Sequence, residues 1–202
     1  MTRNAVLSSW AFIALLVLSS PAIAQDPSTA TYDWKHGTML TGLAGAAVAP
    51  SADTRAVLGG GFGWELNHWA AIEGYGAWLV PRHEDQGFSA DLMALVNLTR
   101  PARVVPFVGA GMGLYIASFD TTAGPVPDFY RARFAEDSVA TRRTFTDPMF
   151  AFSAGIDIMM RARWSIRPAV NVKLVTDGSS AYVVTIAAVS IGYHFERHDV
   201  GQ

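Results

Sequence analysis

The sequence contains no cysteine, so no disulfide bond can hold the folded chain together. Small exported domains rely on disulfides when their cores are too small to be stable alone, and this chain must be stabilised in another way. Charged residues are also scarce, at 16% of the 202 residues, and the formal net charge is −2. Without a basic excess, no nucleic acid is expected as a partner.

The first 24 residues have the features of a secretory signal peptide. Arg3 supplies a positive start, the stretch AVLSSWAFIALLVL is apolar, and AIAQ contains an Ala-x-Ala cleavage site that ends at Ala24. The apolar stretch is shorter than the roughly 20 residues that a membrane-spanning helix needs. We therefore predict export with cleavage after Ala24, a leader at 25–35, one domain over 36–195 and a C-terminal tail at 196–202.

After this signal the sequence lacks any apolar run long enough to span a membrane as a helix, yet half of all residues are hydrophobic. Eighteen glycines, most of them inside apolar segments, argue against a helical bundle. The apolar residues alternate instead, as in SIRPAVNVKL at 165–174, where every second residue is apolar or proline. Because successive side chains of a strand point to opposite faces, this pattern predicts β-strands with one apolar face.

Eight segments of this kind are separated by turn signals. We predict strands at 37–48, 55–65, 69–79, 87–98, 104–117, 149–160, 164–174 and 181–195. The second, fourth and sixth connections are short and the other four are as long or longer. This alternation is typical of an up-and-down barrel with one plain end and one elaborated end. The longest connection, 118–148, mixes arginines, acids and prolines and is predicted to be a solvated loop.

When neighbouring strands are paired through the three short connections, polar residues lie opposite polar residues and apolar residues opposite apolar residues. A sixth turn centred on Ala162 places Asp157 opposite Arg167, and it pairs the remaining polar residues with polar residues. Turns centred on Asn67 and on Pro101 likewise pair like with like. Agreement between three turns supports a single register for the whole sheet.

Two prolines, Pro106 and Pro168, lie inside predicted strands that have neighbours on both sides. Each removes one hydrogen bond from a ladder. Because both prolines lie a few residues from a short turn, we predict β-bulges near the rim that carries the short turns.

The polar face of the predicted strands is also the face that carries most of the glycines. Its polar members are Glu65, Glu73, Asp91, Asp157, Arg167, Asn171 and Lys173, together with Asn97, Ser153 and His194. Small residues fit the crowded concave side of a narrow eight-stranded barrel. We therefore predict that this face lines the lumen and that the apolar face contacts lipid, where only a closed sheet satisfies its backbone groups. A soluble lipocalin-like barrel, with the opposite arrangement, is an alternative.

Aromatic residues gather near the ends of the predicted strands, as in the girdles of membrane barrels. They are Trp64, Trp164, Tyr193 and Phe195 towards the short-turn end, and Trp78 and Phe150 towards the other end. The predicted fold class is therefore all-β, an eight-stranded antiparallel up-and-down transmembrane β-barrel.

The signal, the eight segments, VVPFVGAGMGLYI at 104–116 and SIGYHF at 190–195 resemble the small outer-membrane β-barrels of Gram-negative bacteria. The nearest group is the OmpA-like transmembrane domain with its opacity-protein and OmpX relatives, and the resemblance covers about 36–195. In that family the last strand normally ends on a terminal phenylalanine; Phe195 matches, although ERHDVGQ follows it.

This resemblance implies an integral outer-membrane protein without catalysis, whose role is envelope integrity or surface contact through the loop at 118–148. The implied partners are outer-membrane lipids, lipopolysaccharide, the barrel-assembly machinery and a possible surface ligand of that loop. Arginines of the loop could contact lipopolysaccharide phosphates, although a mixed-charge solvated loop is the simpler interpretation.

Asp157 and Arg167, with Glu73 at a similar height, could instead gate a narrow pore, as the resemblance to OmpA-type interiors implies. The simpler interpretation is that charges in a narrow barrel pair because unpaired burial is costly. His194 could act as a general base, as in the lipid A deacylases. However, it is predicted in the lumen and no His-x-Ser pattern occurs, so no nucleophile is expected within its reach.

Two further patterns resemble ligand-binding motifs. RHED at 82–85 sets a histidine beside two carboxylates, but metal sites need three or four convergent ligands, and a charged outer loop is the better interpretation. GGGFG at 59–63 and GAGMG at 109–113 lie within predicted strands and lack the helix and lysine of nucleotide-binding loops. We predict no catalytic residue, no metal and no cofactor.

Overall fold

The computed structural model of the chain describes residues 37–50, 52–82, 85–100, 102–122, 126–134, 141–161 and 163–196. The predicted signal peptide, the leader and the tail beyond Glu196 lie outside these residues. Within them the elements are β1 (Gly37–Val48), β2 (Arg55–Asn67), β3 (Ala70–Arg82), β4 (Asp85–Asn97), β5 (Val104–Asp120), α2 (Asp128–Phe134), β6 (Arg142–Arg161), β7 (Trp164–Thr176) and β8 (Ala181–His194). No helix in this described part is long and apolar enough to cross a membrane.

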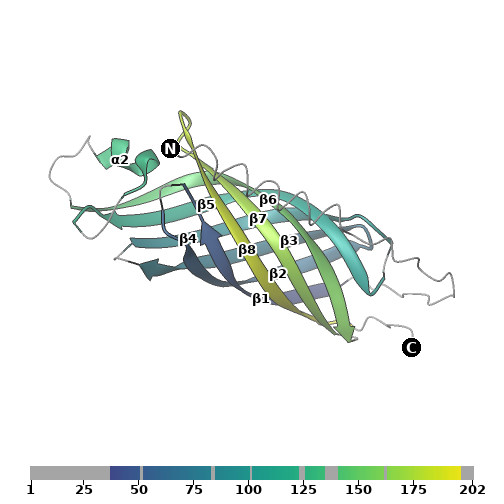
Figure 1. Cartoon of the computed structure of the whole chain (residues 1–202). Coiled ribbons are helices and arrows are strands. Elements are labelled where there is room, and N and C mark those ends of the chain that lie inside the picture. Colours follow the sequence, from purple (N-terminus) through teal and green to yellow (C-terminus); the bar gives the residue numbers. More distant parts are fainter. Residues whose placement is uncertain are drawn as a thin grey trace, which may run out of the picture. The chain divides into compact units, whose positions relative to one another are not determined.

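The eight strands form one closed antiparallel barrel in sequence order, and β1 pairs with β8 to close it (Figure 1). The predicted all-β, eight-stranded up-and-down fold is confirmed. Seven strands lie within three residues of their predicted bounds at each end, whereas β6 begins at Arg142, seven residues before the predicted start.

The pairing of β6 with β7 follows the predicted register, because Gly155 faces Ala169 and Ile158 faces Ile166. The predicted registers of β2 with β3 and of β4 with β5 are wrong by two residues. Glu73 of β3 faces Gly63, since a bulge follows Glu65 at the end of β2. A shift of two residues leaves every side chain on its predicted face, so the faces are unaffected.

Bulges do occur near the short-turn rim, as predicted, but not at the two prolines, because Pro106 faces Ile156 and Pro168 faces Val189 without a register shift. Pro106 accepts a hydrogen bond from the Leu98 amide at 2.8 Å, and Leu98 lies just beyond the end of β4. The backbone N–H that Pro106 lacks would point towards this turn residue, so its absence does not interrupt the pairing of two strands. The register shifts occur at strand ends instead, at Glu65–Asn67, Leu79–Arg82 and Met159–Arg161.

The outer surface of the barrel carries large apolar side chains. Met112 is 66% exposed, Leu92 60% and Phe152 51%, and comparable residues occur on all eight strands. The charged side chains in the middle of the strands, among them Glu73, Arg167 and Lys173, are instead buried inside the barrel. Glycines line the inside where strands crowd; a Cβ added at Gly111 or Gly113 would clash with backbone of β4.

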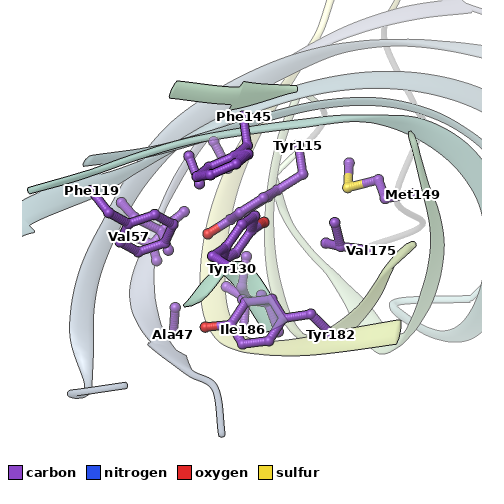
Figure 2. Close-up of a cluster of buried hydrophobic side chains, with 14 of the residues drawn as sticks. Ala47, Val57, Tyr115, Phe119, Tyr130, Phe145, Met149, Val175, Tyr182 and Ile186 are labelled. Carbon is purple, nitrogen blue, oxygen red and sulfur yellow. The ribbon is translucent and has the colours of Figure 1, made fainter. Parts of the chain in front are cut away.

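The interior has two parts, and the predicted polar lumen describes only the part nearer the short turns. Towards the long connections, the interior is an apolar core that also receives α2 (Figure 2). Its members include Val57, Tyr115, Phe119, Tyr130, Phe145, Met149, Val175, Tyr182 and Ile186. These side chains close the end of the barrel that carries the long connections, which we call the outer mouth.

The predicted loop at 118–148 is shorter than expected, because β5 and β6 extend into it as a paired hairpin. Ser118 faces Thr144, and Asp120 faces Arg142. In this extension the inward residues Phe119 and Phe145 are aromatic, whereas the outward residues Thr144 and Thr146 are polar. The alternation is thus reversed relative to the middle of the barrel, and this reversal is why the sequence pattern indicates a loop.

Candidate functional site

The strongest charge cluster in the interior is built around Arg167 of β7. Its Nη1 donates to both carboxylate oxygens of Glu73 at 2.7 Å, and its Nη2 donates to Asp157 Oδ2 at 2.7 Å. Nη1 also donates to the Tyr75 hydroxyl at 3.0 Å, and that hydroxyl donates to Glu73. The guanidinium lies 5.0 Å from the centre of the Phe107 ring.

The sheet brings these groups together from three strands. Asp157 comes from β6, the neighbour of β7, whereas Glu73 comes from β3, on the opposite wall of the barrel. All three charged side chains are buried, and the Oδ1 atom of Asp157 has no hydrogen-bond partner. Removing one member of such a cluster would leave charge in a poorly solvated interior.

A second ion pair lies nearer the middle of the barrel. The Lys173 ammonium donates to Asp91, and to the Ser89 hydroxyl at 2.7 Å, with all three side chains buried. Asn171 is half-buried and lines the adjoining cavity together with Arg167, Lys173 and Asp91. This cavity has a volume of about 30 Å³, which holds one or two water molecules.

The remaining predicted lumen residue, Glu65, lies beside His194 in a third polar group. The His194 Nδ1 atom is 3.4 Å from Glu65 Oε1, and its Nε2 atom is 3.1 Å from the Ser165 hydroxyl. The expectation that no nucleophile lies within reach of His194 is therefore wrong. Sequence reasoning missed Ser165 because the pair is separated by 29 positions and comes together only through the β7–β8 pairing.

The order carboxylate, imidazole, hydroxyl is that of a hydrolase triad. However, Ser165 is 1% exposed and His194 is completely buried. Neither residue lines the 30 Å³ cavity. In this arrangement a substrate has no access to the hydroxyl, which is enclosed together with His194 inside the barrel.

The outer mouth is closed by α2. The Tyr130 ring lies 4.7 Å from Phe119, 5.0 Å from Phe145 and 5.6 Å from Tyr182, measured between ring centres (Figure 2). The Tyr130 hydroxyl is buried without a hydrogen-bond partner, and burial raises its pKa. None of these aromatic contacts was predicted, because α2 lies within the segment expected to be a solvated loop.

Two ion pairs at the outer mouth connect α2 with β6 and β2 with β4. Arg133 of α2 donates to both oxygens of Asp147 at 2.8 and 2.9 Å, and its guanidinium lies 4.5 Å from the Phe145 ring centre. Arg55 pairs with Asp85 at 2.9 Å, and both side chains are buried. Asp85 belongs to the RHED segment; the histidine and glutamate of that segment lie outside the described residues.

The predicted interface aromatics all lie on the outer surface. Trp64, Trp78, Phe150, Trp164 and Phe195 are exposed and Tyr193 is half-buried. On the β7–β8 side, three of these rings form a ladder, with ring centres 5.0 Å apart for Trp164 and Tyr193 and 5.4 Å apart for Tyr193 and Phe195. Among the described residues, no group of three or more histidines, aspartates and glutamates is placed to hold a metal ion.

Solved structures of similar fold are small outer-membrane barrels. The Neisserial surface protein A matches with a TM-score of 0.58 at 10% identity, covering 79% of this chain and 97% of that one. The N-terminal β-barrel domain of Pseudomonas aeruginosa OprF matches with a TM-score of 0.54 at 12% identity, covering 80% and 100%. Ail, the attachment invasion locus protein of Yersinia pestis, matches with a TM-score of 0.52 at 13% identity, covering 79% and 98%.

No protein-family model and no curated protein sequence matches the chain. At these low identities the similarity concerns the fold, which is the fold of the family that the sequence resembles.

Proposed function

We propose that this chain is an integral outer-membrane β-barrel with a structural or surface-interaction role in the cell envelope and without catalysis. The observation that carries the proposal is the inversion of the barrel, with large apolar side chains outside and ion pairs inside. Water would strongly disfavour so large an apolar exterior, whereas a bilayer accommodates it. A soluble barrel of the lipocalin kind would need the opposite arrangement.

The described strands suit a membrane in length as well. Each contains at least 12 residues, and a tilted strand of about 9–11 residues crosses the hydrocarbon core. The short turns then face the periplasm, and α2 with the β5–β6 hairpin faces outwards. Insertion by the barrel-assembly machinery and removal of the signal after Ala24 belong to the same proposal.

Surface contact would use the outer end. Arg131 on α2 and Arg142 at the start of β6 are exposed, and they could meet lipopolysaccharide phosphates or an acidic surface ligand. Arg133 is half-buried and paired with Asp147 inside the mouth. Arg131 is also paired, with Asp128 at 3.0 Å, but that pair is exposed to solvent.

Membrane fractionation tests the location. Expressed in a Gram-negative host, the chain should stay in the outer-membrane pellet after carbonate washing and dissolve in detergent. It should also run faster on a gel before boiling than after it, because a closed barrel stays compact. Release by carbonate alone would contradict the proposal and favour a soluble periplasmic barrel.

A narrow pore is the second candidate, and the buried Glu73–Arg167–Asp157 cluster is the observation that favours it, because paired charges could exchange partners and open a path. Against it, the aromatic core fills the outer mouth and the lumen cavity holds one or two waters. Planar-bilayer recordings decide between the two. The structural proposal predicts no steady conductance for the wild-type chain, whereas channel events altered by Arg167→Ala would support the pore.

A further inference from the structure

At the short-turn end of the barrel, an arginine is attached to the exposed aromatic ladder. Arg163, in the β6–β7 turn, donates from Nη1 to the Tyr193 hydroxyl at 3.0 Å. Tyr193 is the middle ring of the ladder, between Trp164 and Phe195, which are 47% and 50% exposed. One cation is therefore held at the edge of an apolar surface on the outside of the barrel.

Two further exposed arginines lie along the same rim, Arg100 and Arg103 in the β4–β5 turn. The Met159 amide of β6 donates to the Arg103 carbonyl at 2.8 Å, and the His194 amide of β8 donates to the Arg163 carbonyl at 2.8 Å. These bonds place the β4–β5 turn beside β6 and the β6–β7 turn beside β8, so the two turns are neighbouring short turns of the same rim.

Acidic charge is sparse there. Among the described residues of the three short turns and of the chain after β8, Glu196 is the one acid, and its carboxylate accepts a hydrogen bond from the Thr38 amide at 2.8 Å. Among these described residues, three guanidinium groups stand against one carboxylate, so this part of the rim carries a positive charge.

We propose that this surface, formed by Arg163, Trp164, Tyr193 and Phe195 and flanked by Arg100 and Arg103, binds the phosphate headgroup of an anionic glycerophospholipid. It rests on the proposed function, which puts this end of the barrel in the periplasmic leaflet. The ring faces contact the first acyl carbons and the glycerol, as aromatic side chains do at membrane interfaces. The guanidinium presents two parallel donors to the phosphate oxygens.

The Tyr193 hydroxyl gives this site its specific geometry. It accepts one of the five donors of Arg163 and so holds the guanidinium beside the rings, and the side chain has further donors to offer a phosphate. An anionic headgroup fits better than a zwitterionic one, because the ammonium of a zwitterionic lipid would meet three arginines. Lipopolysaccharide phosphates would lie at the other end of the barrel.

Native mass spectrometry of the purified barrel, released from nanodiscs of equal phosphatidylglycerol and phosphatidylcholine content, tests the site. The wild-type chain should retain phosphatidylglycerol preferentially, and the preference should fall about fivefold for each rim arginine replaced in R100Q, R103Q and R163Q. The matched control R82Q removes one exposed arginine from the other end of the barrel and should keep the preference, whereas R163Q alone should lower it about fivefold. Tyr193→Phe keeps the charge and should weaken retention by releasing Arg163.

Equal retention of the two lipids by the wild-type chain would overturn the site, as would an equal loss in the R82Q control and in R163Q. An unchanged preference in Tyr193→Phe would overturn the role of the hydroxyl. A chain that enters no bilayer of either lipid would overturn the membrane location itself, and the site with it, so the two failures are distinguishable.

Discussion

The guanidinium of Arg167 on β7 holds both carboxylate oxygens of Glu73 on β3, 94 positions earlier in the sequence, at 2.7 Å. In the strand order of the barrel these two strands lie on opposite walls. The contact therefore crosses the lumen and braces the barrel from within. Asp157 shares the same guanidinium, so two buried carboxylates depend on one cation.

Replacing Arg167 with methionine should destabilise the barrel by about 3–5 kcal/mol, because two carboxylates lose their cation in a buried site. Urea unfolding in lipid vesicles, followed by tryptophan fluorescence, measures the loss. Arg131→Met, at an exposed position of α2, is the control and should shift the midpoint little. Adding Glu73→Gln to Arg167→Met should recover part of the loss, and an unchanged midpoint in the single variant would contradict the bracing role.

Two substitutions of Tyr130 separate the contribution of its ring to stability from that of its hydroxyl. Its hydroxyl is buried without a partner, so Tyr130→Phe should leave stability unchanged or raise it, since an unsatisfied group is removed. Tyr130→Ala should cost about 3–5 kcal/mol, because the ring fills the outer mouth. Both are measured by the same unfolding experiment. A large loss in Tyr130→Phe would mean that the hydroxyl has a partner in the working protein.

Ser165 should be chemically inert despite its hydrogen bond to His194. A fluorophosphonate probe labels serines that are both activated and accessible, and Ser165 is 1% exposed. We expect no labelling of the folded wild-type barrel and the same background in Ser165→Ala. Labelling that disappears in Ser165→Ala would instead assign a hydrolase centre to the Glu65–His194–Ser165 group.

Asp177, in the turn between β7 and β8, should titrate below the ordinary range of an aspartate. Its carboxylate accepts hydrogen bonds from the amides of Ser180 and Ser179, at 2.8 and 2.9 Å, and these bonds lower its pKa. The carboxylate therefore stabilises this turn above the pKa of the unfolded chain, and the effect is lost as pH falls through the folded pKa. Carbon-detected NMR titration measures the shift, and Asp177→Asn should abolish this pH dependence of the turn amides. A pKa at the ordinary aspartate value would contradict the expectation.

The strands, their order and their two faces could be predicted because apolar and polar residues alternate along each strand of a membrane barrel, one residue outside and the next inside. The register of β6 against β7 could be predicted because the pairing that matches polar with polar residues is also the pairing that their turn allows. The registers around Asn67 and Pro101 were not, because turn geometry sets them; the Asn67 side chain accepts hydrogen bonds from the amides of Trp69 and Ala70, which a pattern of polarity does not reveal.

The outer part of the interior could not be predicted for a different reason. Beyond the apolar belt, outward positions such as Thr144 and Thr146 are polar while the inward Phe145 is aromatic. The alternation reverses there, so strand and loop look alike in sequence. The Ser165–His194 contact was equally hidden, because neither residue belongs to a local motif.

Site-directed spin labelling tests the inverted barrel most directly, and the absence of native cysteine makes each label unique. Labels at Met112 and Phe152, on the apolar exterior, should show high accessibility to oxygen and low accessibility to a water-soluble nickel chelate in reconstituted vesicles. A label at Thr146, above the belt, should show the reverse. High nickel accessibility at Met112 and Phe152 in a folded, vesicle-bound chain would contradict the membrane location of this surface.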